Sequence, residues 1–200
     1  MSSNIGVMGH PIGHTKSPIF QQAGLNELGI DETFEAWDVL PEDLEDKVAT
    51  FREKGFIAAC VTLPHKQAVI PMVDELTEAA ESVGAVNWIF NRDGKLIGHN
   101  TDCNGFLRAL KEEAGFDPKG ADAVVFGAGG AARAIVYALK TAGVNRLTIA
   151  NRTVEKAQAL ANDFSEGRFK PTATGMSRDE LSNYVPYANL LVNTTSLGMA

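Results

Sequence analysis

Strand-like runs and helical segments alternate along the whole of this 200-residue chain, and this alternation constrains its fold more than any other feature. The strand-like runs are apolar or β-branched and lie at 5–8, 34–40, 56–63, 86–90, 95–97, 123–126, 147–150 and 189–192. Helical patterns follow Ser17 and Asp102 and cover 41–54, 131–142 and 154–164. This order is typical of an α/β protein with a largely parallel sheet. The apolar run 56–63 predicts a buried central strand, and Asp93-Gly94 is a hairpin signal.

We expect two domains, with the boundary in or beside the helix that follows Asp102. In this interpretation residues 1–103 form the first domain and residues 104–200 form the second. The second contains only about three expected strands, whereas a doubly wound domain normally has five or six. The sequence therefore predicts a second domain that is incomplete at its C-terminus. The alternative is a compact half-domain that ends there.

Composition and charge exclude several classes of protein. Apolar residues make up 44% of the chain and charged residues 22%, which is typical of a globular protein. No run approaches the roughly 18 to 20 apolar residues of a membrane helix, and the start lacks a secretory signal pattern. Two cysteines make no disulfide framework and no zinc motif, so we expect a reduced, cytoplasmic protein without a metal. The sequence leaves open whether the protein is a monomer or a homodimer.

The net charge of −7 argues against a nucleic-acid partner, because non-specific binding to nucleic acid relies on a basic face. The charge is unevenly distributed. Residues 1–102 hold 7 Lys/Arg and 16 Asp/Glu, whereas residues 103–200 hold 11 and 9. An anionic ligand is therefore expected mainly in the second half.

A glycine-rich turn lies between an expected strand and an expected helix at 127–132, with the sequence GAGGAA. In a dinucleotide-binding turn the first glycine permits the tight bend, and the second lets the backbone approach a pyrophosphate. A small third residue, here Ala132, lets the helix pack close to the strand. Exposed N–H groups and the helix dipole then favour phosphate. The pattern predicts a Rossmann-like cofactor domain, although an ordinary tight turn has similar residues.

The end of the next strand indicates which dinucleotide binds. NAD-binding domains carry an Asp or Glu about 20 residues after the turn. Asn151, Arg152 and Thr153 stand at the corresponding position, without a carboxylate, and Lys156 lies one turn further on. A guanidinium can pair with a 2′-phosphate, so NADP is the expected cofactor. A solvated basic helix start is the alternative.

Polar residues of the first half also fall at expected strand ends and turns. They are Thr15, Lys16, Ser17, Thr62, Lys66, Asn87, Asn100, Thr101 and Asp102. Strand ends are where α/β proteins build sites, and a lysine beside a carboxylate can exchange a proton with a hydroxyl. Periodicity alone does not show that these groups converge. Lys66 could instead be a solvated lysine at a helix start, and Asp102 a helix N-cap.

Several of these motifs, in this order, resemble the shikimate dehydrogenase family. They are GHPIGHTKSP at 9–18, VTLPHK at 61–66, GAVN at 84–87, NTD at 100–102, GAGGAARA at 127–134, NRT at 151–153 and NTTSLGM at 193–199. The resemblance covers essentially the whole chain. It implies an α/β substrate domain and an NADP-binding domain separated by a cleft. It also implies reversible reduction of 3-dehydroshikimate to shikimate, a step toward chorismate and the aromatic amino acids.

The same resemblance implies a role for each site residue. Thr15 and Ser17 would hold the substrate carboxylate, Lys66 would be the acid/base residue and Asp102 its partner. Thr62 and Asn87 would complete the pocket, while His14 and His65 would border the cleft without catalytic roles. The expected cofactor residues are Gly127, Ala128, Gly129, Gly130, Ala131, Asn151, Arg152, Thr153, Lys156, Thr194, Thr195 and Ser196.

Four residues depart from the family pattern. Thr15 stands in place of Ser, Cys60 in place of Asn, and His99 and Cys103 flank the NTD motif in place of Asp and Gly. We expect Cys60 to be a small buried group on the central strand. The departures at Thr15 and Cys60 keep open a paralogue that acts on quinate or another hydroxylated cyclohexane carboxylate, or that uses NAD. A catalytically idle NADP-sensing protein is a further alternative, and the presence of both Lys66 and Asp102 argues against it.

Overall fold

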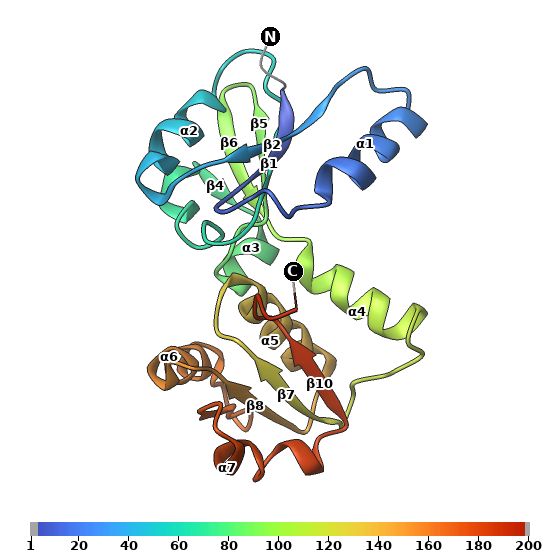
Figure 1. The fold of residues 1–200 in the computed structure, drawn as a ribbon, viewed down its shortest axis with the longest axis vertical. Helices are drawn as coiled ribbons and strands as arrows, with labels where there is room; N and C mark the ends of the chain where they lie inside the picture. The colour runs from blue at the N-terminus through green and yellow to red at the C-terminus, as the bar shows by residue number, and fades with distance from the viewer. Residues whose placement is uncertain (1–3, 199–200) are drawn as a thin grey trace. The chain divides into compact units, whose positions relative to one another are not determined.

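The computed structural model describes residues 4–198, which form two compact units that divide between Thr101 and Asp102 (Figure 1). The division falls within two residues of the sequence-based boundary and at the start of the expected helix. Each unit has its own sheet and its own buried core, and each is described by itself.

The first unit is built on a mixed six-stranded sheet with the order β2-β1-β3-β5-β6-β4. Its elements are β1 (Ile5–Gly9), α1 (Ser17–Glu27), β2 (Phe34–Asp38), η1 (Pro41–Asp43), α2 (Leu44–Thr50), β3 (Ala58–Val61), η2 (Ile70–Met72), β4 (Glu75–Leu76), α3 (Glu78–Val83), β5 (Trp88–Arg92) and β6 (Lys95–His99). β1 pairs in parallel with β2 and β3, and β4 with β6, whereas β5 is antiparallel to both neighbours. The expectation of a largely parallel sheet therefore holds only in part here.

The antiparallel part follows from the predicted hairpin. β5 and β6 are joined by the two-residue loop Asp93-Gly94, and both residues have positive φ (55° and 86°). Two positive φ values are the requirement of a type I′ turn, whose twist matches that of the flanking strands.

Helices cover both faces of this sheet (Figure 1). On one face Leu25 of α1 packs with Val7 and Phe34 of the sheet. On the other, Leu44 and Val48 of α2 belong to a larger buried cluster with strand residues. The resulting α/β/α layering leaves the strand ends as the places where polar groups can gather.

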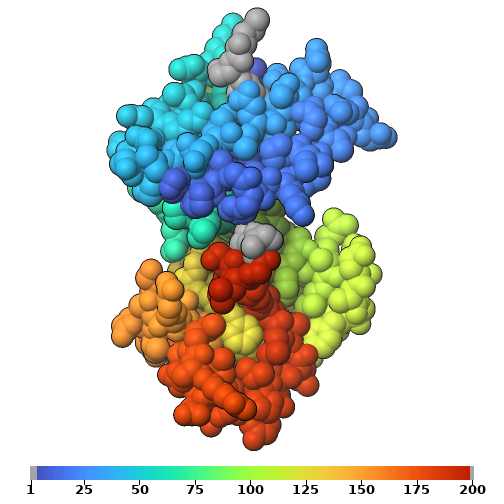
Figure 2. Space-filling model, in the orientation of Figure 1, coloured from blue at the N-terminus to red at the C-terminus, as the bar shows by residue number. Residues whose placement is uncertain are grey.

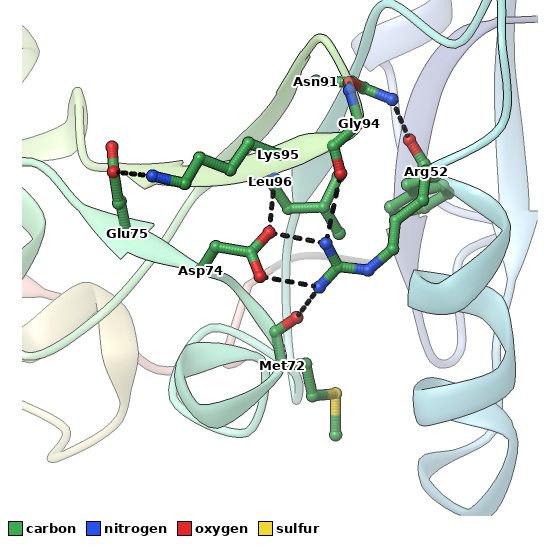
Figure 3. A network of polar contacts seen from close by, with 9 residues as sticks. Arg52, Met72, Asp74, Glu75, Asn91, Gly94, Lys95 and Leu96 are labelled. Carbon is green, nitrogen blue, oxygen red and sulfur yellow. Dashed lines mark hydrogen bonds and ion pairs between the residues drawn. The ribbon is translucent and has the colours of Figure 1, made fainter.

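A polar network closes one edge of the first unit (Figure 3). The Arg52 guanidinium contacts both Asp74 carboxylate oxygens, at 2.5 and 3.2 Å, and donates to the Gly94 carbonyl at 3.2 Å. Asp74 also accepts from the Leu96 amide at 2.7 Å, while Lys95 pairs with Glu75. Hydrogen bonding to Arg52 lowers the pKa of Asp74, with a further contribution from the Leu96 amide. The network ties the turn after α2 to β4 and to the β5–β6 hairpin.

The second unit is built on a four-stranded sheet with the order β10-β7-β8-β9, in which every pairing is parallel. Its elements are α4 (Asp102–Glu112), β7 (Asp122–Phe126), α5 (Gly130–Ala142), β8 (Arg146–Ala150), α6 (Val154–Phe164), β9 (Thr172–Thr174), α7 (Arg178–Leu181), η3 (Val185–Tyr187) and β10 (Leu190–Asn193). Apolar residues of α5 and α6 share one cluster with Val125 and Ile149 of the sheet. Both helices therefore cover the same face, and α4 packs on α5.

The strand order reverses beside β7. From β7 the chain moves outward through β8 to β9 and then returns to place β10 on the other side of β7. A parallel sheet has its ligand crevice at such a switch point, outside the carboxyl ends of the strands. In this unit that position lies between the ends of β7 and β10.

Several expected element bounds were wrong, each for a local reason. The strand expected over 56–63 spans only Ala58–Val61, since Pro64 lacks an N–H to donate and Ile57 and Leu63 are exposed. The helix expected over 41–54 is a short 3-10 turn followed by α2, which ends at Thr50. The second unit has four strands in place of about three, because the three-residue β9 is too short for a periodic signal.

Candidate active site

A turn of hydroxyl groups precedes α1 in the first unit. The Thr15 hydroxyl donates to the Ser17 hydroxyl at 3.1 Å, and the Ser17 amide donates to the Thr15 oxygen at 3.2 Å. Ser17 is the first residue of α1, and Pro18 follows it in the first turn. A hydroxyl that accepts a bond keeps its own O–H to donate, and the start of a helix favours negative charge. The turn is therefore suited to binding a carboxylate.

The segment that begins at the end of β1 and leads to α1 approaches the end of β3 closely. The Gly9 carbonyl accepts from the Val39 amide, and the His10 amide donates to the Leu63 carbonyl, both at 3.0 Å. A Cβ on Gly9 would lie 2.5 Å from the Thr62 methyl group and 2.8 Å from the Leu63 carbonyl. Only glycine fits there, so the end of β1 meets the loop that carries Thr62.

Lys66 lies in a run of turns over 63–69 and not at a helix start. Its side chain is half-buried, which argues against the simple solvated lysine. The Val86 amide donates to the Lys66 carbonyl at 2.7 Å, and the His65 amide donates to Thr62 at 2.9 Å. Backbone bonds on both sides therefore fix where this lysine leaves the chain.

Asn87 joins this region to the end of β6. Its side-chain amide donates to the Thr101 hydroxyl at 2.8 Å and accepts from the Thr101 amide at 2.9 Å. Its own backbone carbonyl accepts from Val61 at 2.7 Å, and the residue is 5% exposed. Thr62 follows Val61 directly, so these bonds bring Thr62, Lys66, Asn87 and Thr101 to one end of the sheet.

Asp102 is covalently attached to Thr101 and is the first residue of α4. It lies within the first helical turn, so the alternative that it precedes the helix as an N-cap was wrong. A carboxylate in this turn interacts favourably with the positive end of the helix. The neighbouring Cys103 thiol is buried, and burial, with a smaller effect of Asp102, raises its pKa.

Two further expectations are tested in the first unit. His65 does not border an open surface: it is 1% exposed, and its Nε2 lies 2.7 Å from the Val39 carbonyl oxygen. Cys60 is half-buried and not fully buried as expected; it lies on β3 between the paired positions Val7 and Trp88 and packs at the edge of the core as a small group.

The glycine turn of the second unit has the geometry that its sequence predicts. Gly127 is buried with φ of +113°, and its amide donates to the Ala150 carbonyl at 2.8 Å. A Cβ on this residue would overlap the Thr194 hydroxyl oxygen. Thr194 in turn donates both its amide (2.8 Å) and its hydroxyl (2.7 Å) to the Phe126 carbonyl. The turn and the end of β10 are therefore packed against each other at the switch point.

The following residues leave the start of α5 accessible. Gly129 is the exposed N-cap, and a Cβ there would meet nothing within 4 Å. Ala128, Gly130 and Ala131 are half-buried, whereas Ala132 is fully buried and allows the close packing expected of the third small position. The open backbone at Gly129 and the amides of the first helical turn fit a pyrophosphate.

The end of β8 carries the expected basic group. The Asn151 amide donates to the Thr174 carbonyl at 3.1 Å, and its side chain donates to the Thr153 carbonyl at 2.8 Å. Arg152 and Lys156 are exposed, and among residues 4–198 neither forms an ion pair. Their charges are therefore available to an anion, which fits the 2′-phosphate of NADP.

The loop after β10 is held by its own side chains. Asn193 accepts from the Thr195 amide (3.0 Å) and hydroxyl (2.7 Å) and donates to the Leu197 carbonyl at 3.0 Å. Ser196 is exposed, and the segment, coloured red, reaches the surface of the second unit (Figure 2). Met199, the last residue of the family motif, lies outside the described residues.

Other features of the described residues lie apart from these groups. A pocket of about 390 Å³ at the amino ends of β7, β8 and β9 is lined by none of the candidate residues. No three His, Cys, Asp or Glu side chains of residues 4–198 form a candidate metal site. Within the same range, no helix is both long and apolar enough to cross a membrane.

Polar strand ends in one α/β unit, and a glycine turn at the switch point of a parallel sheet in the other, define a two-unit α/β protein with a dinucleotide-binding unit of the Rossmann type. Comparison with known proteins identifies the particular family. Residues 7–89 match the shikimate dehydrogenase substrate binding domain, and residues 109–197 match shikimate / quinate 5-dehydrogenase. The chain belongs to the shikimate dehydrogenase family, which confirms the resemblance seen in the sequence.

Individual proteins agree with this assignment. The chain is 45% identical to shikimate dehydrogenase (NADP(+)) of Methanopyrus kandleri over 98% of its own length and 68% of that protein. The crystal structure of shikimate dehydrogenase from Aquifex aeolicus superposes with a TM-score of 0.86 at 34% identity, covering 98% of this chain and 70% of that one. The Thermus thermophilus enzyme in complex with NADP(H) and shikimate gives 0.81 at 36% identity, covering 97% and 69%. The chain thus spans about two thirds of the length of these relatives.

Proposed function

We propose that this protein catalyses the reversible, NADP-dependent reduction of 3-dehydroshikimate to shikimate. The observation that carries the proposal is the occurrence of two distinct sets of polar groups in one chain of this family. The first unit has a hydroxyl turn and Lys66 at one sheet end, and the second has an open glycine turn beside exposed cations. A cyclic hydroxy acid and a phosphorylated dinucleotide match these two sets in charge and in hydrogen-bonding groups.

In the first unit, Thr15 and Ser17 bind the substrate carboxylate through their hydroxyl groups. The bond from Thr15 places the two hydroxyls 3.1 Å apart and leaves the Ser17 O–H to donate to the carboxylate, while Thr15 donates once its hydroxyl turns from Ser17 to the substrate. Thr62 and Asn87 line the pocket. The Asn87 side chain is already held on both its oxygen and its nitrogen by Thr101, so it contributes a rigid wall.

Lys66 acts as the acid/base residue with Asp102 as its partner. Bound NADPH supplies the hydride that reduces the C3 carbonyl carbon. Lys66 donates a proton to the carbonyl oxygen as that oxygen becomes a hydroxyl, and in the oxidation direction it accepts the proton back. The Asp102 carboxylate orients the ammonium group, and both side chains also bond ring hydroxyls. The fixed backbone around Lys66 and the attachment of Asp102 to the anchored Thr101 support these roles.

In the second unit, residues 127–131 bind the pyrophosphate through backbone N–H groups at the start of α5. Asn151, Arg152, Thr153 and Lys156 bind the adenosine 2′-phosphate. Thr194, Thr195 and Ser196 lie beside the nicotinamide. The contact between Gly127 and Thr194 at the switch point supports a continuous binding surface for one extended cofactor.

A quinate-oxidising enzyme is the second candidate, and a specific observation favours it. The family matched by the second unit includes quinate dehydrogenases, and Cys60 provides a thiol that hydrogen-bonds only weakly. The half-buried Cys60 lies two residues before Thr62 on the same strand, close enough in sequence to alter the pocket.

The test is an assay of the purified full-length protein with shikimate and with quinate, each with NADP and with NAD. We expect shikimate-dependent formation of NADPH, with kcat/KM for NADP at least tenfold above that for NAD. A higher kcat/KM for quinate would support the second candidate. Binding of NADP without turnover of either acid would contradict both and would leave an idle cofactor-binding protein.

A further inference from the structure

We propose that His65 is a positioning residue for Lys66, acting through a buried hydrogen bond from its imidazole Nε2–H to the carbonyl of Val39. The inference rests on the proposed catalytic role of Lys66. It concerns a side chain that the chemistry of the reaction does not require, because the imidazole is 1% exposed and is held by a backbone carbonyl.

The geometry fixes the direction of this bond. A carbonyl oxygen only accepts, so the ring nitrogen 2.7 Å from the Val39 oxygen must carry the hydrogen. Val39 follows β2, and its own amide donates to the Gly9 carbonyl at the end of β1 at 3.0 Å. The Val39 N–H is therefore bonded to the end of β1, and the Val39 carbonyl is bonded to the imidazole of His65.

The backbone of His65 extends the connection to the loop that follows β3. Its amide donates to the Thr62 carbonyl at 2.9 Å, and its carbonyl accepts from the Val69 amide at 3.0 Å. Val39 and Val69 both belong to the buried cluster of the first unit. His65 is therefore bonded directly to the residues that follow β2 and β3, and through Val39 to the end of β1, and Lys66 is the next residue in the chain.

Removal of the imidazole N–H would leave the Val39 carbonyl without this donor in a buried place. A buried acceptor that loses its donor is unfavourable, so the loop would shift until the oxygen found another partner. The shift would move Lys66, since it is the next residue in the chain and its carbonyl accepts from the Val86 amide. A catalytic group displaced by about 1 Å loses rate steeply.

The experiment compares three substitutions in the full-length protein. His65→Gln keeps an amide N–H near the position of Nε2, whereas His65→Asn is too short to reach and His65→Leu has no donor. We expect His65→Leu and His65→Asn to lower kcat at least tenfold with NADP affinity unchanged, and His65→Gln to stay within about threefold of wild type. Equal kcat for the Leu and Gln variants, whether high or low, would overturn the proposal.

A matched control separates positioning from general loss of stability. Asn91 also donates from its side chain to a backbone carbonyl in the same unit, that of Phe51, at 2.7 Å, and its side-chain oxygen accepts from the Gly94 amide at 2.7 Å. Asn91→Leu should lower the free energy of unfolding but leave kcat of the folded protein at the wild-type value. A fall in kcat as large as that of His65→Leu would contradict a specific role for His65.

A readout independent of turnover distinguishes failure of this proposal from failure of the proposed function. Hydrogen exchange at the Val86 amide, which donates to Lys66, should accelerate at least tenfold in His65→Leu. Exchange at the Val61 amide, which donates to Asn87, should stay within about threefold of wild type. If the wild-type protein oxidises neither shikimate nor quinate while hydrogen exchange at the Val86 amide responds as expected, the positioning role of His65 holds and the proposed reaction is wrong. An unchanged Val86 amide would overturn the positioning.

Discussion

Replacing Gly127 with alanine is expected to destabilise the second unit by about 2–4 kcal/mol. A non-glycine residue at its φ of +113° carries strain of about 1–3 kcal/mol. The new Cβ would also overlap the Thr194 hydroxyl, which donates to the Phe126 carbonyl at 2.7 Å. Loss of that bond adds about 1 kcal/mol. Strand β10 would separate from β7 at the place where the strand order reverses.

Gly129→Ala is the matched control, two residues away in the same turn. Its φ of −93° is ordinary, and a Cβ there would meet no atom within 4 Å. Alanine is less favourable than glycine at an N-cap, but it also reduces the entropy of the unfolded chain. Because these effects offset each other, the free energy of unfolding should change by no more than about 1 kcal/mol. The methyl group would nevertheless stand where a pyrophosphate approaches the backbone, so NADP affinity should fall at least tenfold.

The assay uses chemical denaturation followed by two signals. Both tryptophans, Trp37 and Trp88, belong to the first unit, so their fluorescence reports that unit alone. Gly127→Ala should shift the far-UV circular dichroism transition to lower denaturant and leave the fluorescence transition in place. NADP affinity is measured by calorimetry. Gly127→Ala with wild-type stability, or Gly129→Ala with wild-type NADP affinity, would refute the reasoning on the turn.

Three further predictions concern charged and titratable side chains. Arg152→Ala should weaken NADP binding about tenfold, or ~1.4 kcal/mol, and leave NAD binding unchanged in titration calorimetry; equal losses for both cofactors would exclude a contact with the 2′-phosphate. Because the pKa of Asp74 is lowered, its pairing with Arg52 stabilises the fold above about pH 4, and this stabilisation is lost as the pH falls further. The urea midpoint of Asp74→Asn should therefore lie below that of wild type at pH 7, and the two midpoints should converge in acid. Iodoacetamide at neutral pH should modify Cys60 before Cys103, because Cys103 is buried with a raised pKa; the reverse order in mass spectrometry would contradict this.

Local chemistry explains why much of the fold could be predicted from the sequence. Asp93-Gly94 and Gly127 adopt the positive φ values that their residue types favour, and Ala132 is buried as a small third position should be. Signals for two overlooked helices were also present. Thr77 caps α3, which Gly84 ends at a φ of 66°, and Ser177 with Glu180 forms a capping box at α7.

The remaining features depend on contacts between residues distant in sequence. β4 and β9 have two and three residues, too few to show alternation, and both exist because longer neighbours pair with them. The paired hydrogen bonds of Asn87 with Thr101 and the burial of His65 against Val39 have no signature in the residues themselves. The sequence therefore indicated which polar residues matter but not how they are held together.

The most direct test of the proposed reaction is the turnover of Lys66→Ala at saturating shikimate and NADP. Loss of a general acid/base group typically lowers kcat by roughly 10²–10⁴-fold, and we expect a fall in this range with the dissociation constant of NADP near wild type. Asp102→Asn should also lower kcat, and the double variant should lose less than the product of the two single effects, because the pair acts as a unit. If Lys66→Ala raises only the KM for shikimate and keeps the wild-type kcat, Lys66 binds the substrate without transferring the proton, and the central claim is wrong.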